Sequence, residues 1–459
     1  MKYLHLLPTL LFGVAVLLFF GLAYPHHLHY QEQYQLFLFD STYVWEIVRQ
    51  PGGVADLLGR FCTQFFLFAW VGAFIIALLL TLIQVLMSRL ADWGWLYGLS
   101  FAPSFLLWLF LLDENALLGG VCAVLLTLLA VWGCLLLPKG RLRVIAAIVA
   151  IPSLYWLAIG GHHYHRYPTV FPALLYAAWL LAVILPCIAH LSSSLIHHPS
   201  SIIPLPSSII HLPSFLLVAV AMGSLVWKNA NFKAEKVMQY DFMAAHQQWN
   251  RILATATAEK PNNQIGVTVQ NLALAMHGLL ADHLLEYHQN GIAGLLPDVQ
   301  SDATSPMPTA EAFYQLGMVY VAQRTVFEAQ EAILDFQKSG RCYKRLAQTN
   351  LIIGSYEVSR KYLTALQKTL FYRDWANETL PLLGDEEAIA RHPEYGRLRR
   401  CAYQKDFYFG DHVTAEMLES LYYGNTDNHL ALEYLKAYYM LTGNREGYTK
   451  LLQQLRVRR

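Results

Sequence analysis

The chain has 459 residues, of which 55% are apolar and only 14% are charged. That average is too apolar for an ordinary soluble protein and too charged for a chain made only of membrane helices. The formal net charge is +1 and both signs are mixed along the sequence, so it has no basic stripe that would follow a phosphate backbone. We therefore expect no nucleic-acid partner.

Charge divides the chain into two unlike parts. Residues 1–228 hold 9 of the 33 basic residues and 7 of the 32 acidic residues, and the rest lie in residues 229–459. Because an ionised side chain at the centre of a bilayer costs several kcal/mol, long apolar stretches without charge are interpreted as membrane spans. We predict an all-α protein, with a transmembrane helical domain over 1–228 and a soluble helical domain over 229–459.

The first part contains a series of stretches long enough to span a membrane, which takes about 20 apolar residues. They cover residues 4–24, 62–88, 94–112, 116–137, 144–161, 170–191 and 209–227. Pro213 interrupts the last stretch, which makes it the weakest. The sequence thus predicts a polytopic bundle of about seven spans.

Basic residues in short loops predict the orientation. Lys139, Arg141 and Arg143 cluster in a very short loop, where the positive-inside rule is most reliable, and this favours a cytoplasmic N-terminus. The outer side then holds Arg49, Arg60, Arg166 and Lys228, so the difference between the two sides is small. With an odd number of spans, we expect a bacterial inner-membrane protein whose C-terminal domain is periplasmic. In that oxidising compartment, Cys342 and Cys401 either form a disulfide or remain buried thiols.

The first outer loop, residues 25–60, is amphipathic and acidic. Asp40, Ser41 or Thr42 is placed to cap a short helix that runs through Val48, and Pro51-Gly52-Gly53 supplies a turn. Amphipathic segments of this kind lie flat at a membrane surface. The loop carries four acids, which are Glu32, Asp40, Glu46 and Asp56.

Two shorter outer loops would meet the first at one membrane surface. One contains Asp113 and Glu114, and the other contains His163, His165 and Arg166. A carboxylate beside a low-dielectric boundary can have a raised pKa and serve as a base, while Arg and His can hold a phosphate. We therefore propose Asp40, Glu32, Asp113 and Glu114 as catalytic candidates, and Arg166, His163 and His165 as substrate-binding candidates.

Simpler roles remain open for the same residues. Asp40 fits a helix cap, Asp113 and Glu114 fit the solvated turn of a short loop, and His and Arg are common interfacial anchors. The histidines of these loops lack the i, i+4 spacing of a metal site, and no CxxC pair occurs. The sequence therefore predicts no metal-ligating residues.

The second part has amphipathic helices with a period near 3.6. Residues 311–336 resemble a tetratricopeptide repeat, because large and small residues fall at the spacings of that motif. The residues concerned are Phe313, Leu316, Gly317, Tyr320, Ala329 and Ile333. Residues 343–370 match less well, with Ala347 and Ser359 at the small positions and Gly354 in the turn, and looser pairs lie near residues 249–278 and 430–455. Stacked helix pairs usually bind a peptide or protein, although a helical cap that merely stabilises the membrane part would look the same.

The whole chain resembles a family of multi-pass membrane proteins of the Bacteroidota to which no activity is assigned. The residues that carry the resemblance are Glu32 to Phe39, Pro51-Gly52-Gly53, Thr63 to Phe66 and Asn271 to Leu274. More distantly, the chain resembles the GT-C superfamily of lipid-linked glycosyltransferases. Those enzymes have a long first outer loop with an acidic residue, matched here by Asp40 or Glu32, and a second acidic motif, matched by Asp113 and Glu114. The first loop lacks the adjacent acid pair of that superfamily.

The GT-C resemblance implies an enzyme that takes a sugar from a polyprenyl phosphate at the outer face of the membrane. Asp40 or Glu32 would activate the acceptor, Asp113 and Glu114 would hold a divalent metal or the acceptor, and Arg166 with His163 or His165 would contact the phosphate. The alternative is a non-enzymatic scaffold whose repeat-like tail recruits envelope proteins or peptides. A transporter is a third and weaker alternative, because the expected spans contain almost no ionisable residues.

Overall fold

All regular elements of the computed structural model are helices within the residues that it describes. These are residues 6–33, 35–91, 93–138, 140–154, 170–195, 207–298, 306–333, 337–403 and 414–458. The all-α fold class predicted from the sequence is confirmed. The chain forms two compact units, Met1–Glu235 and Lys236–Arg459, and the division falls inside helix α11 (Phe232–Ala245).

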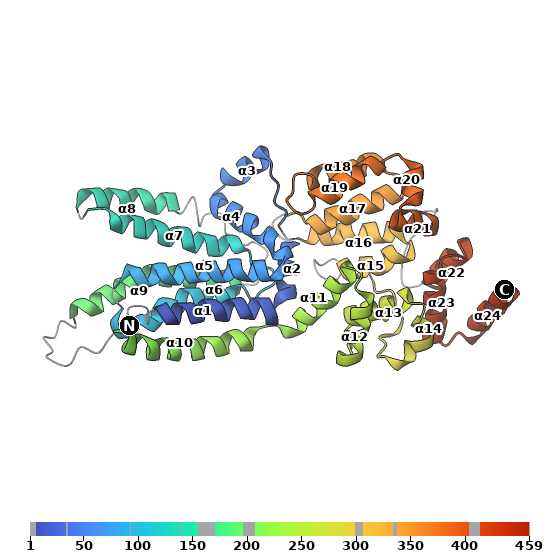
Figure 1. The fold of residues 1–459 in the computed structure, drawn as a ribbon, viewed down its shortest axis with the longest axis horizontal. Helices are drawn as coiled ribbons and strands as arrows, with labels where there is room; N and C mark the ends of the chain where they lie inside the picture. Colours follow the sequence, from blue (N-terminus) through green and yellow to red (C-terminus); the bar gives the residue numbers. More distant parts are fainter. Residues whose placement is uncertain are drawn as a thin grey trace. The chain divides into compact units, whose positions relative to one another are not determined.

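The first unit contains long apolar helices that pack side by side, and shorter helices at one end (Figure 1). The long or apolar elements are α1 (Leu7–Leu18), α5 (Ala69–Leu90), α6 (Ala102–Phe110), α7 (Leu118–Leu136), α8 (Arg141–Leu154), α9 (Val170–Leu195) and α10 (Ser207–Asn229). The shorter elements are the π-helical turn η2 (Phe19–Ala23), α2 (Pro25–Glu32), α3 (Ser41–Val48), α4 (Gly53–Thr63), and the 3₁₀ segments η3 (Gln64–Leu67) and η4 (Gly94–Phe101).

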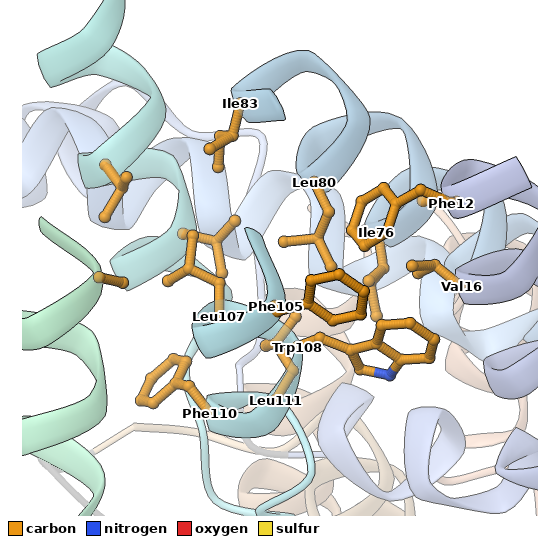
Figure 2. Packing of buried hydrophobic residues seen from close by; sticks show 14 of the residues in the cluster. Phe12, Val16, Ile76, Leu80, Ile83, Phe105, Leu107, Trp108, Phe110 and Leu111 are labelled. Carbon is orange, nitrogen blue, oxygen red and sulfur yellow. The ribbon is translucent and has the colours of Figure 1, made fainter. Parts of the chain in front are cut away.

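A continuous aromatic and aliphatic core joins α1, α5 and α6 (Figure 2). The ring of Phe12 on α1 meets that of Phe105 edge to face at 5.1 Å, and Phe105 stacks on Trp108. Such ring pairs add about 0.5–1.5 kcal/mol beyond the area that they bury. Because Phe110 and Leu111 at the end of α6 are also buried, the core fixes the start of the acidic turn that follows.

Helices occupy all seven places where spans were expected, but fewer are long and apolar enough to cross a membrane. Three qualify among the described residues, which are Ala69–Leu90, Leu118–Leu136 and Leu212–Asn229. A fourth is added if Leu7–Ala23 and Pro25–Glu32, which are bent by 80° at Tyr24, count as one broken span. The expectation of about seven spans is therefore corrected to three or four for the described helices.

Proline and local changes of helix type explain the difference. Pro25 has no N–H and its ring clashes with the preceding turn, so α1 and η2 end at Tyr24 and α2 starts in a new direction. The stretch 94–112 divides between η4 and α6, so it contributes only a shorter apolar helix. Helix α9 has 26 residues, of which Ala173–Pro186 have described side chains and form an apolar segment shorter than a span. The stretch 144–161 is described only as far as Leu154.

Two glycines bring α4 against the start of α7. A Cβ on Gly59 would lie 2.3 Å from the backbone nitrogen of Gly119, so only glycine permits this approach. Gly52, with φ of +78°, forms the expected turn between α3 and α4. Helix α4 thus ends, at Thr63, beside the turn that precedes α7.

The described residues of the second unit form helices that are joined by turns. Its longer helices are α12 (Trp249–Glu259), α13 (Gln264–Met276), α15 (Pro306–Leu316), α16 (Val319–Ala332), α17 (Gly340–Ile352), α18 (Tyr356–Leu366), α22 (Thr414–Gly424), α23 (His429–Thr442) and α24 (Arg445–Arg458). Shorter ones are α14 (Leu280–His283), α19 (Arg373–Thr379), α20 (Glu386–Arg391) and α21 (Pro393–Cys401), with 3₁₀ turns at Leu284–Glu286, Gly291–Gly294 and Leu380–Leu382. Neighbouring helices pack in sequence order, α15 on α16, α16 on α17 and α17 on α18.

The helix pairs α15/α16 and α17/α18 lie where the repeat-like spacing predicts them. Gly317 and Gly354 take positive φ in the two turns, and Ala329, Ala347 and Ser359 are buried. Tyr320 departs from the pattern because it is 44% exposed, although the motif places a packed residue there. Cys342 and Cys401 are both buried free thiols, so no disulfide joins them.

Candidate functional site

Two acid-bearing segments of the first unit meet at one end of its apolar helices. The side-chain nitrogen of Gln31, on α2, donates hydrogen bonds to the backbone oxygens of Asp113 (3.3 Å) and Ala116 (3.2 Å). One turn earlier on α2, Nε2–H of the buried His27 donates to the backbone oxygen of Leu111 at 2.9 Å, since that oxygen can only accept. The first loop and the turn at residues 113–117 are therefore fixed to each other by side chains of α2.

A small pocket opens between these segments, and we call it the polar pocket. Its walls are Gln31, Gln35, Thr63, Glu114, Asn115, Ala116 and Leu117. Its volume is about 10 Å³, which is room for about one water molecule. Five of its seven lining residues have polar side chains, which is unusual at the end of an apolar bundle. The polar pocket joins α2, the end of α4 and the acidic turn.

Gln35 carries the most unusual side chain of the polar pocket. It is 2% exposed, and neither its amide nitrogen nor its amide oxygen has a hydrogen-bond partner among the described residues. A buried amide without partners costs about 1–3 kcal/mol, so native structures seldom keep one without a reason. A buried water molecule in the polar pocket would supply these partners.

The two predicted acids of the turn differ in their surroundings. The Asp113 carboxylate accepts the backbone N–H of Asn115 at 2.7 Å, and burial raises the pKa of this carboxyl to about 6. The negative charge of Glu114 adds to the rise. Glu114 itself lines the polar pocket. An acid that titrates near neutral pH beside a second carboxylate suits proton transfer.

The two predicted acids of the first loop lie apart from the polar pocket lining. Asp40 is the N-cap of α3, because its carboxylate accepts the backbone N–H groups of Thr42 (3.0 Å) and Tyr43 (3.2 Å). This is the simpler of the two roles that the sequence left open for it. Glu32, the last residue of α2, is buried at 7% exposure. Neither acid is among the residues that line the polar pocket.

The remaining predicted site residues cannot be placed. Arg166, His163 and His165 lie outside the described residues, so their proposed contact with a phosphate stays a prediction. Within the described parts of the chain, no three His, Cys, Asp or Glu side chains gather closely enough to hold a metal ion. The described acids of the two segments therefore do not form a donor set that fits a divalent metal.

Glu235 is a buried acid at the same end of the bundle that the sequence analysis missed. Its two carboxylate oxygens accept the backbone N–H groups of His26 (2.7 Å) and His27 (2.9 Å), at the N-terminus of α2. Burial raises the pKa of this carboxyl to about 7, while the two N–H bonds lower it. Glu235 anchors α2, and hence Gln31 and Gln35, to the start of α11. Nothing in the local sequence marks it, because its partners are backbone groups more than 200 residues away.

Arg60 is a second charged residue whose role the sequence left unassigned. It forms an ion pair with Asp56, one turn earlier on α4, at 2.7 Å, and it approaches the hydroxyl of Tyr43 on α3 at 3.5 Å. The i, i+4 spacing of Asp56 and Arg60 was the signal for this pair. Because it ties α3 to α4, the pair shapes the first loop rather than the polar pocket.

Comparison with known proteins identifies a family for this chain, but that family has no known function. A family model described as "Family of unknown function (DUF6057)" matches residues 1–459. No curated protein matches the chain, and no solved structure matches it either.

Proposed function

Because the chain belongs to this family of unknown function, we propose its function from its own residues: a GT-C-like membrane glycosyltransferase that takes a sugar from a polyprenyl phosphate. It would act at the outer face of a bacterial inner membrane. The observation that carries the proposal is the pairing of Gln31 with the backbone of Asp113 and Ala116. That pairing joins the two acidic segments on which the GT-C resemblance rests.

The proposed chemistry is a direct displacement at the sugar. Glu114 takes the proton of an acceptor hydroxyl, and the hydroxyl oxygen forms a bond to the anomeric carbon of the donor sugar. The bond from that carbon to the phosphate oxygen breaks, and the polyprenyl phosphate leaves with its electron pair. We place the base at Glu114 rather than Asp40, because Glu114 lines the polar pocket and the Asp40 carboxylate caps α3.

Asp113 and the undescribed loop have supporting roles in this proposal. The raised pKa of Asp113, about 6, lets it hold or release a proton beside Glu114 near neutral pH. Arg166 with His163 or His165 would bind the leaving phosphate, as a guanidinium and imidazoles commonly do. No step is assigned to a metal, because the described acids do not form a set that fits one.

Transfer of label in membranes tests the proposal. Membranes that contain the chain are incubated with polyprenyl-phosphate-linked [¹⁴C]glucose, [¹⁴C]mannose or [¹⁴C]arabinose, and label is measured in lipid extracts and in the residue left after extraction. Glu114→Gln should lower transfer on the order of 100-fold, since loss of a general base typically costs that much or more. Asp40→Asn is the matched control, because asparagine caps a helix as well as aspartate and transfer should persist. Full transfer by Glu114→Gln, or no chain-dependent transfer from any donor, would contradict the proposal.

A second candidate, a scaffold that recruits envelope proteins, is favoured by one feature of the tail. Tyr320 and Phe327, two turns apart on α16, are each 44% exposed. Tyr320 also borders a small apolar pocket that includes Met417 and Leu421 of α22. Exposed aromatic residues beside a pocket are typical anchors for a partner segment. If the helix pairs act as tetratricopeptide-like repeats, a peptide would bind here.

Cross-linking in intact cells separates the two candidates. The full chain and its Tyr320→Ala/Phe327→Ala variant are cross-linked, purified and analysed by mass spectrometry. Val457→Ala, an apolar change at a more exposed position away from α16, is the control. The scaffold role predicts a protein that is captured by the native chain and the control and lost with the double variant. Identical capture by all three would count against it.

A further inference from the structure

A cavity much larger than the polar pocket lies within the second unit, and we call it the α23 cavity. It opens between the C-terminal end of α13, helix α21 and the start of α23, and its volume is about 540 Å³. Sites that hold a small organic molecule usually have about 300–1,000 Å³, so this cavity has room for one. The wall residues that determine its chemistry are Met276, Arg397, Asp427, Leu430, Leu432 and Glu433.

Arg397 presents a positive charge to the α23 cavity. Its terminal nitrogens donate to the backbone oxygen (3.0 Å) and to Oε1 (2.6 Å) of Gln315, at the end of α15. A guanidinium has five N–H groups, so the other three have no partner among the described residues. Because these two bonds fix the half-buried side chain in place, its remaining donors suit a carboxylate, which can accept two N–H groups side by side.

The two carboxylates of the wall differ in their partners. Oε1 of Glu433 pairs with Lys436 at 2.9 Å, and Oε2 accepts the backbone N–H of Ala281 at 3.1 Å, so this charge is already matched. Asp427 lies in the turn before α23, and its exposed carboxylate has no partner among the described residues. Asp427 is therefore available to a positively charged group of a ligand.

The available positive and negative groups lie near each other without pairing. Burial raises the pKa of the Cys401 thiol, and the charges of Arg397 and Asp427 act on that thiol in opposite directions, which places both charges close to it. Cys401 itself lines the cavity. Arg397 and Asp427 nevertheless form no ion pair with each other. The cavity thus offers one site for an anionic group and one site for a cationic group.

This pair of charges excludes ligands that carry only one sign. A phosphate would pair with Arg397 but would be repelled by Asp427 and Glu433, and an amine without a carboxylate would be repelled by Arg397. A metal ion does not fit, because no three His, Cys, Asp or Glu side chains of the described residues gather closely enough to hold one. A ligand with one ammonium and one carboxylate satisfies both available groups.

We infer that the α23 cavity binds a zwitterion built from amino acids, which is a free α-amino acid or a short peptide with free termini. Arg397 binds its carboxylate and Asp427 binds its ammonium. Met276, Leu430 and Leu432 add apolar surface to the wall, which favours a ligand with an apolar side chain. This site belongs to the second unit and does not depend on the proposed transferase activity.

Binding of leucine and its peptides to the full chain tests the inference. The chain is kept in nonionic detergent micelles, and saturation-transfer NMR follows titrations with L-leucine, L-leucyl-L-leucine and tri-L-leucine. We expect saturable binding of at least one probe. Its C-terminal amide lacks the carboxylate and should bind about tenfold more weakly, because hydrogen bonds between charged groups are lost. Its N-acetyl form should bind about threefold more weakly, because an ion pair to an exposed carboxylate contributes less.

Two variants connect that binding to the wall. Asp427→Asn should weaken binding of the free probe about threefold and remove the difference between the free and N-acetyl forms. Arg397→Gln should weaken binding of the free probe about tenfold. Because Asp427 lies in an exposed turn, its variant keeps the test valid even if Arg397→Gln fails to fold. Glu387→Gln and Arg400→Gln, which change exposed charges outside the wall, are the matched controls and should bind like the native chain.

Each outcome supports or overturns the inference. Weaker binding of both capped probes, with the same dependence on Asp427, supports the zwitterion site, and the probe that binds most tightly distinguishes an amino acid from a peptide. No saturable binding of any probe, or equal binding of the free and capped forms, overturns the inference. Binding that requires the carboxylate but neither the ammonium nor Asp427 also overturns it, because the cavity would then recognise anions alone.

Discussion

Two buried acids of the first unit are held differently from the buried acids of the second unit. In the second unit, buried acids face buried bases: Arg341 forms a double hydrogen-bonded pair with Asp241 (2.6 and 2.8 Å), and Arg345 pairs with Glu311. In the first unit, neither Glu235 nor Asp113 pairs with a base among the described residues, and both accept backbone N–H groups instead.

This difference shows where chemistry is expected in the chain. A carboxylate paired with a buried base cannot lose that base without leaving an uncompensated charge, so the pair has a structural role. A buried carboxylate without a basic partner has a raised pKa, because burial disfavours the charged form by more than the N–H bonds favour it. Burial thus raises the pKa of Asp113 to about 6 and that of Glu235 to about 7, where each can exchange a proton near neutral pH. The proposed proton transfer therefore belongs to the end of the bundle that carries α2, where Asp113 and Glu235 lie.

Removing one partner of a buried ion pair should have the largest effect. Asp241→Leu leaves the Arg341 guanidinium, 14% exposed, without its counter-charge, and should destabilise the second unit by about 3–5 kcal/mol. Hydrogen exchange of the α17 amides in the full chain measures the loss. The double variant Asp241→Leu/Arg341→Met should recover most of it, because an apolar pair leaves no charge unpaired. Unchanged exchange in the single variant would mean that the pair contributes nothing to the second unit.

The free energy of unfolding of the first unit should fall as pH rises through neutrality. An acid whose pKa is lowered by folding would give the opposite trend. Folding raises the pKa of Glu235 from 4.5 to about 7, so the folded state binds this proton more tightly than the unfolded state. Stability is then fully present below about pH 4.5 and falls as pH rises through about 7, by up to about 3 kcal/mol. Thermal unfolding of the native chain and of Glu235→Gln between pH 4.5 and 8 measures this difference.

The glutamine variant isolates the contribution of Glu235. Its side chain cannot ionise, so the difference in unfolding temperature between the two proteins should change with pH and level off above about pH 7. Asp113 titrates in both proteins and cancels in the comparison. A difference that is constant from pH 4.5 to 8 would show that Glu235 is ionised throughout.

The smallest expected change in stability is at Asp40, whose carboxylate caps α3. Asp40→Ala removes the acceptor of the Thr42 and Tyr43 amides and should destabilise α3 by about 1 kcal/mol, while Asp40→Asn should change little. Faster hydrogen exchange confined to those two amides in the alanine variant checks this. Loss of stability through the whole bundle would assign Asp40 a wider role than a cap.

Local signals predicted local structure well. The cap at Asp40, the turn at Gly52 and the helix pair around Gly317 each depend on a few neighbouring residues, and the structure contains all three. The span count was wrong because apolar composition does not report where a helix bends or changes type, as at Pro25 and between η4 and α6. Length and apolarity are therefore necessary for a span without being sufficient.

The candidate site was predictable only in part. The sequence placed Asp113 and Glu114 near the first loop, and the structure brings that turn against α2. It did not indicate Gln31, Gln35 or Glu235, because their roles depend on backbone atoms or on a pocket shared by three separate segments. From the sequence alone, a glutamine in an amphipathic loop is expected to be exposed to solvent, whereas Gln31 and Gln35 are buried.

Cross-linking between α2 and the acidic turn tests the central claim of this account most directly. In a chain without its six native cysteines, Gln31→Cys and Ala116→Cys are treated in intact membranes with a short thiol-specific cross-linker. The account predicts an efficient internal cross-link that either single variant lacks, because the Gln31 side chain reaches the Ala116 backbone at 3.2 Å. No cross-link, with the two thiols labelled from opposite sides of the membrane, would contradict the shared pocket and the chemistry proposed for it.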